Sequence, residues 1–163
     1  MNKKAFTLIE LLVVIVLMAI IIGISVPMFS GISQGQALRG ATRSIASTLS
    51  LSRQWAITHR TPVRFAYVTI NSNGTPYSTY TVKDGTDNTI IQKEERLADG
   101  VAFDINGVSG ADDKNRYFTF KSDGGINLVT QDQEITIADI RKPNDVHKKI
   151  IVNWLTGGVR VED

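Results

Sequence analysis

The chain has 163 residues, of which 42% are hydrophobic and 21% charged, and its formal net charge is +2. This size suits one domain with short additional segments, and the small charge gives no global basic field that would attract nucleic acid. Cysteine is absent, which excludes disulfides, thiolate metal sites and thiol catalysis. A folded domain in this chain therefore has to be stabilised by its hydrophobic core.

A near-continuous apolar run extends from Phe6 to Pro27, after Lys3 and Lys4, and contains one charged residue, Glu10. As a helix it would reach about 33 Å, enough for a hydrocarbon core of roughly 30 Å. The positive-inside rule would keep the lysines cytoplasmic and place the rest of the chain across the membrane. An ordinary anchor does not explain Glu10, because a carboxylate in such a helix costs about 2.5–3.5 kcal/mol.

The run also differs from a secretory signal peptide, which has a shorter apolar part and an A-x-A-like cleavage site; residues 23–27 contain none. The basic start, the apolar run and Glu10 together resemble the class III signal of type IV pilins and type II secretion pseudopilins. The resemblance implies that prepilin peptidase cuts between Ala5 and Phe6 and that the new amine of Phe6 is methylated. This family usually has Gly before the cut, where the present chain has Ala5.

The same resemblance implies a role for Glu10 in assembly, where it would pair with the N-terminal amine of a neighbouring subunit. Such a pair would offset the cost of burying the carboxylate and fix the axial register. The alternative is a Glu10 that snorkels to the cytoplasmic interface, only about four residues from the start of the run. Loss of the two leader lysines would lower the formal charge from +2 to 0.

A second helical pattern follows, and we expect it to continue the first helix. Pro27 removes one backbone donor and predicts a kink. Beyond it, an apolar and small-residue stripe recurs with i, i+3, i+4 spacing. The predicted stripe consists of Leu38, Ala41, Ile45, Leu49, Ser52 and Ala56. Thr61 and Pro62 are expected to end the helix.

The period then changes to two, which predicts a β-rich head. The expected strands cover residues 62–70, 77–82, 89–96, 101–105, 117–120, 126–129, 134–140, 146–154 and 159–161. Asn73-Gly74 lies within a strong turn signal between the first two, which predicts a hairpin. The expected fold is α+β, with a long N-terminal helix packed on an antiparallel β-sheet domain. The expected segments are a leader (1–5), a transmembrane and assembly helix (6–28), an amphipathic second half (29–60) and the head (61–163).

Four stretches of the predicted helix and head refine the resemblance. Residues 45–65, 97–103, 117–126 and 150–161 are similar to the GspH/FimT group of minor pseudopilins and minor pilins. In that group a Ser/Ala-rich helix with an Arg leads into a strand, an F-x-x-x-G hairpin follows, and a Gly-turn strand closes the domain. The resemblance implies a pilin-like, non-enzymatic subunit with a single pass through the inner membrane and a periplasmic C-terminal domain. It would assemble with other pilin or pseudopilin subunits, priming or capping a type IV pilus or a type II secretion pseudopilus.

The sequence contains no recognisable catalytic or metal-binding motif. The helix serines lie outside any G-x-S-x-G motif, and no catalytic residue or cofactor is assigned. Asp104, Asn106, Asp112 and Asp113 offer oxygen atoms to a cation, but their spacing fits no EF-hand and such loops are common in turns. We therefore assign no metal site.

Nucleic acid is the alternative partner. Some FimT-type minor pilins bind DNA for uptake through a C-terminal G-R-x-R turn, and residues 157–160 (GGVR) retain its final Arg160. Lys148 and Lys149 would add phosphate contacts. Acidic residues interleaved with these cations, among them Glu162, would dilute the basic patch. The alternative function is that of a DNA-binding minor pilin in competence.

Overall fold

A computed structural model describes residues 7–72, 75–103, 116–127, 131–141 and 147–162. Side chains are described within these ranges except at residues 24–34 and Asn71. The expected leader, the Ala5–Phe6 cleavage site and the four oxygen-bearing residues between Asp104 and Asp113 lie outside the described residues. The chain divides into two units, residues 1–35 and 36–163, and each is considered by itself.

One helix, α1, runs from Leu8 to His59. It begins after Thr7, whose Oγ1 accepts a hydrogen bond from the Glu10 backbone N–H (3.4 Å) and whose carbonyl oxygen accepts one from Leu11 (3.3 Å). It ends before Arg60, which has a left-handed φ of 55°. The predicted end of the helix is therefore confirmed. The Pro27 side chain is not described, so the kink there remains a prediction.

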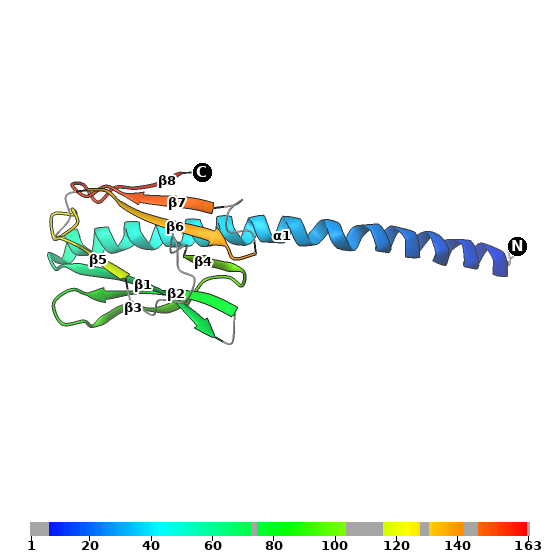
Figure 1. Ribbon diagram of the computed structural model, residues 1–163, viewed down its shortest axis with the longest axis horizontal. Helices are drawn as coiled ribbons and strands as arrows, with labels where there is room; N and C mark the ends of the chain where they lie inside the picture. Colours follow the sequence, from blue (N-terminus) through cyan, green and yellow to red (C-terminus); the bar gives the residue numbers. More distant parts are fainter. Residues whose placement is uncertain (1–6, 73–74, 104–115, 128–130, 142–146, 163) are drawn as a thin grey trace, which may run out of the picture. The chain divides into compact units, whose positions relative to one another are not determined.

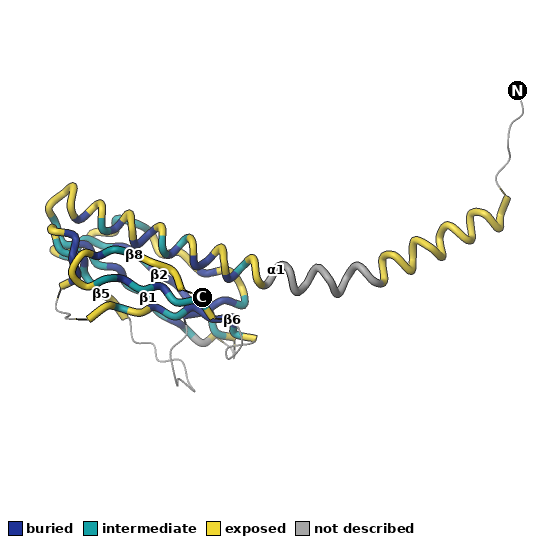
Figure 2. Tube along the Cα trace, turned by 90° about the horizontal axis from the view of Figure 1, so that it is seen from above, coloured by how far each residue is buried: buried dark blue, intermediate teal, exposed yellow. Residues whose placement is uncertain are grey.

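In the first unit, every described side chain from Thr7 to Gly23 is exposed, as Figure 2 shows for this part of α1. Fifteen of the sixteen residues from Leu8 onward are uncharged, and Glu10 is the exception. Within the described ranges, no helix has the length and apolar character that a membrane span requires.

The described part of the second unit, residues 36–163 and called the head below, contains eight strands (Figure 1). They form two four-stranded sheets with the orders β3-β2-β1-β5 and β4-β6-β7-β8, and the neighbouring strands pair antiparallel. Their bounds are β1 Val63–Ser72, β2 Thr75–Asp84, β3 Ile90–Arg96, β4 Val101–Phe103, β5 Arg116–Phe120, β6 Gln133–Asp139, β7 His147–Val152 and β8 Val159–Glu162. The predicted α+β fold and the β1–β2 hairpin are confirmed.

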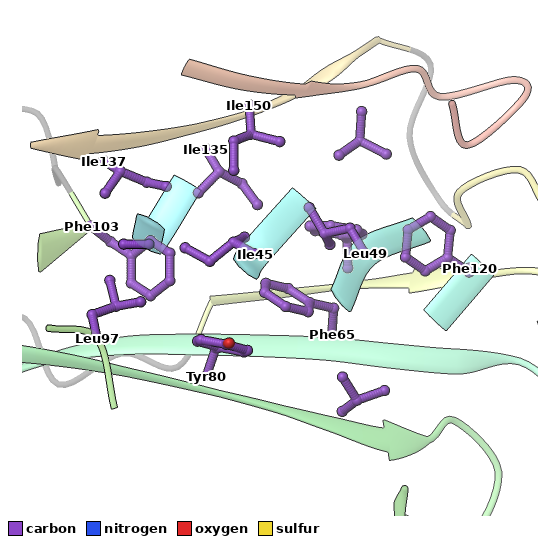
Figure 3. Packing of buried hydrophobic residues seen from close by; sticks show 14 of the residues in the cluster. Ile45, Leu49, Phe65, Tyr80, Leu97, Phe103, Phe120, Ile135, Ile137 and Ile150 are labelled. Atoms are coloured by element: carbon purple, nitrogen blue, oxygen red, sulfur yellow. The ribbon is translucent and has the colours of Figure 1, made fainter. Parts of the chain in front are cut away.

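The core of this unit lies where α1 meets both sheets. In Figure 3, Ile45 and Leu49 of the helix lie between Phe65 and Tyr80 of one sheet and Ile135 of the other. All six residues of the predicted stripe are buried, from 0% exposure for three of them to 8% for Ala41. Small residues in the stripe permit close packing of the helix on the strands, since interiors are packed at crystal-like density.

Of the strand predicted over residues 126–129, only residues 126 and 127 are described, and they belong to no strand. Ile126 makes a single β-bridge to Phe120, and its backbone N–H donates to the Trp154 carbonyl oxygen at 2.8 Å. Before it, Lys121 N–H donates to the Gly125 carbonyl oxygen at 2.7 Å, closing a turn. The Asn127 N–H also donates to the Thr119 carbonyl oxygen at 2.8 Å, so two backbone bonds flank the single bridge. Ile126 itself is buried in the core.

Candidate functional site

Glu10 lies in the first turn of α1, and its side chain is exposed. Its neighbours Leu8, Ile9 and Leu11 are 86%, 71% and 57% exposed. No described residue forms a hydrogen bond or ion pair with the Glu10 carboxylate. The charge suits the positive end of the helix dipole. A lone carboxylate among exposed apolar side chains can accept a cation from another molecule.

Thr7 and Glu10 also form the sequence pattern of a capping box, Thr-x-x-Glu, at the start of the helix. The bond from Glu10 N–H to Thr7 Oγ1 supplies half of this motif. Sequence reasoning missed it, although the spacing was visible in the chain. The described cap therefore depends on the Thr7 side chain and the Glu10 backbone N–H, whereas the Glu10 carboxylate supplies the charge.

In the head, the three body motifs meet at Arg53. This half-buried residue of α1 lies beside two glycine turns, one at Gly124 and one at Gly157. Arg53 Nε is buried and makes no hydrogen bond to a described residue. A Cβ at Gly124 would lie 3.2 Å from this atom, and a Cβ at Gly157 would also lie 3.2 Å from it. The helix Arg, the F-x-x-x-G hairpin and the Gly-turn strand of the sequence motifs are thus parts of one structural junction.

Both glycines have positive φ, 90° at Gly124 and 66° at Gly157. A side chain at Gly157 would collide with the Gly124 carbonyl oxygen, and one at Gly124 would come within 2.9 Å of Ile57 Cδ1. The sequence resemblance implied a glycine-containing hairpin and a Gly-turn strand here, but gave no sign that the two turns touch. The junction holds the β5 end of one sheet and the β7–β8 turn of the other against the helix.

The predicted nucleic-acid residues do not form one basic surface. Lys149 Nζ lies 2.8 Å from Glu134 Oε1, and Arg160 Nε lies 3.1 Å from Glu162 Oε1. The hydrogen bond from Lys149 lowers the pKa of Glu134, and Glu134 in turn raises the pKa of Lys149. Each of these cations is therefore matched by a carboxylate on the same surface, which reduces the field available to phosphate. Lys148 points to the other side of β7, because side chains alternate along a strand.

Three further polar side chains of the described head are those of Tyr80, His59 and His147. Tyr80 OH donates to Glu95 Oε2 at 2.7 Å and lies 3.1 Å from Ser44 Oγ, and burial raises the pKa of this tyrosine. His59 stacks on Trp55 with ring centroids 3.9 Å apart, and His147 is exposed. Among the described residues, no three His, Asp or Glu side chains come together in a way that could hold a metal ion.

Comparison with known proteins gives two family matches. The family described as type II transport protein GspH matches residues 41–157, and the prokaryotic N-terminal methylation motif matches residues 1–26. The first match covers most of the chain and includes Arg53, Gly124 and Gly157. No curated protein sequence matches the chain.

Solved structures of similar fold include the type IV minor pilin FimU of Pseudomonas aeruginosa. One crystal form has 12% identity and a TM-score of 0.59, covering 80% of this chain and 92% of that one. A second form has 12% identity and a TM-score of 0.55, covering 77% and 93%. The minor pseudopilin EpsH from the type 2 secretion system of Vibrio cholerae has 14% identity and a TM-score of 0.48, covering 77% and 95%. The FimU similarity shows a shared pilin-like fold.

Proposed function

Because this chain belongs to the GspH family of type II transport proteins, we propose that it assembles through α1 into a type IV pilus or a type II secretion pseudopilus, or primes or caps one. It is a pilin-type structural subunit of the GspH/FimT kind and not an enzyme. In the proposed pathway it is inserted in the inner membrane, cut between Ala5 and Phe6, and methylated at Phe6. The head then lies in the periplasm.

The observation that carries the proposal is the isolated carboxylate of Glu10 on an apolar helix that bears the methylation motif. After cleavage, the Phe6 amine would place a cation at the start of α1, where the helix dipole disfavours positive charge. A Glu10 carboxylate from a neighbouring subunit would neutralise that amine, and the amine would supply the partner that Glu10 lacks. In an apolar surrounding, this pair would offset the cost of burying the amine and the cost of burying the carboxylate.

The exposure of the helix supports the same proposal. Side chains such as Leu17, Ile20 and Ile22 are each more than half exposed in the isolated chain. A contiguous apolar surface of this kind requires lipid or protein to cover it. Membrane before assembly and the helices of other subunits after assembly would each provide that cover.

The capping pattern allows a sharp test of Glu10. Glu10→Gln removes the charge but keeps a residue that suits the capping box, whereas Thr7→Ala removes the cap and keeps the charge. We expect Glu10→Gln and Glu10→Ala to reach the membrane normally and to lose on the order of tenfold or more in the filament fraction. Thr7→Ala should assemble, because it costs only about 1 kcal/mol of helix stability.

The measurement is the ratio of filament-bound to membrane-bound chain, with mass spectrometry of the mature N-terminus as the control for processing. Each variant should lack residues 1–5 and carry one methyl group on Phe6 if cleavage is unaffected. Normal assembly of Glu10→Gln would contradict the charge pair.

The alternative of a DNA-binding minor pilin predicts a different result. If Lys148, Lys149 and Arg160 bound phosphate, a gel-shift of the full-length chain in detergent would retard DNA, with strong salt dependence. We expect no retardation at low salt, because Lys149 and Arg160 are each paired with a carboxylate. Retardation that is lost on Arg160→Gln would support the DNA-binding function and contradict our expectation.

A further inference from the structure

Cations lie on both faces of the sheet that contains β7 and β8. On the outer face, Lys149 and Arg160 are each matched by a carboxylate. On the side that faces α1, a groove of about 410 Å³ is lined by Arg39, Thr42, Arg43, Lys148 and Val161. Three cations thus line one groove, and none of its described lining residues is acidic.

The elements of the head bring these residues together. Arg39 and Arg43 lie one turn apart on α1, and both are exposed. Lys148 and Ile150 share the helix-facing side of β7, and Val161 of β8 pairs with Ile150. Thr42 is buried between the arginines, with its hydroxyl donating to the Leu38 carbonyl oxygen at 2.8 Å.

Arg39 and Arg43 make no hydrogen bond or ion pair with any described residue. Like charges at i and i+4 destabilise a helix, so contacts among the described residues do not explain why both positions are arginine. Two guanidinium groups on one edge instead suit a carboxylate, which they can hold by paired, charge-assisted hydrogen bonds. The favourable occupant of this groove is therefore an anion.

We propose that this groove is the docking site for an acidic side chain of an adjacent pilin-type subunit. The inference rests on the proposed function and names the chemistry of the partner. Val161 is 46% exposed and gives the groove an apolar wall, which suits the short aliphatic stem of Glu or Asp below its carboxylate.

The experiment uses the full chain in its native cells. Because the chain has no cysteine, Arg39→Cys gives a single attachment point for a short photo-crosslinker beside the intact Arg43. We expect cross-links to an Asp- or Glu-containing segment of another subunit that carries the methylation motif. Arg43→Glu should lower the filament-bound fraction by about tenfold, the effect of losing one close charge pair. Reversing the identified acid to Arg should restore assembly of Arg43→Glu.

Lys93→Glu is the matched control, because it makes the same change of charge at an exposed position on β3 of the other sheet. Arg43→Gln and the thermal melting curve of each variant separate lost docking from lost folding. If Arg43→Glu and Arg43→Gln assemble normally while Glu10→Gln does not, the groove proposal is wrong and the proposed function stands. If Glu10→Gln also assembles normally, the failure lies with the proposed function.

Failure of the acid reversal to restore assembly would also overturn the proposal. The proposal would also be wrong if Arg43→Glu lost binding to vesicles of anionic phospholipid, or to duplex DNA, while its assembly stayed unchanged. In those cases the groove would take a phosphate and not a protein carboxylate.

Discussion

Gly157 lies where no side chain fits. Its φ of 66° is left-handed, and a Cβ there would collide with the Gly124 carbonyl oxygen and approach Arg53 Cδ to 3.1 Å. The neighbouring Gly158 has neither restriction, since its nearest contact would be the Thr156 hydroxyl at 3.2 Å, at the end of a side chain. The requirement for glycine therefore belongs to one of the two adjacent positions, and it follows from the contact between two turns.

This difference gives a test with a matched control. We expect Gly157→Ala to destabilise the head by at least about 1–2 kcal/mol from the left-handed backbone alone, with the collision adding to this. The corresponding fall in melting temperature is roughly 5 °C or more for a domain of this size. Gly158→Ala should cost less than about 0.5 kcal/mol, the range of an unconstrained surface change. Circular dichroism melts of both variants provide the measurement, and equal melting temperatures would contradict the junction.

The ion pairs of the head could not be predicted from the sequence, because they depend on how the strands pair. Lys149 and Glu134 are separated along the chain, and they meet only because β6 and β7 pair with Thr136 opposite Lys149. Shifting that register by one residue would turn every side chain of a strand to the other face. The sequence shows interleaved acids and bases here, but which lysine faces Glu134 and which lines the groove depends on the register.

At the scale of elements, the helix and the strands differ in how well their patterns predict them. The six predicted stripe positions of α1, from Leu38 to Ala56, are all buried, because they repeat one period over five turns. The prediction missed Thr42 and Thr48, which are buried on the same helix. The β1–β2 hairpin was also predicted, since alternating runs flank a strong turn signal. Residues 126–129 were predicted as a strand from four residues only. A run this short does not show whether a single bridge, such as that between Phe120 and Ile126, extends into a ladder.

The candidate site also has a part that the sequence could predict and a part that it could not. The first turn of α1 could be identified from sequence, because Glu10 is one charge in an apolar run and local spacing suffices. The Arg53 junction could not, since its three members come from α1, the turn after β5 and the turn before β8. Each motif predicts its own turn or helix, but the contact among them is a tertiary property that no local pattern contains.

At the scale of the whole molecule, the head contains all of its own core. Every buried and packed residue of the hydrophobic cluster lies between Ala37 and Val159, within the second unit. The exposed apolar side chains of the first unit contribute nothing to that cluster. The hydrophobic cluster of the head therefore lies within the second unit, and its stability can be tested without the first.

This separation predicts that a fragment beginning at Gln36 folds alone. It keeps Leu38, the first buried member of the helix stripe, and every residue of the hydrophobic cluster. We expect a cooperative thermal transition within a few degrees of that of the head in the full chain, apart from fraying of an uncapped first turn. A fragment beginning at Arg43 provides the control, because it lacks Leu38 and Ala41. Loss of a buried leucine alone costs about 2–5 kcal/mol. If the Gln36 fragment instead melts without cooperativity and binds hydrophobic dye, the first unit would have to supply part of the stability of the head.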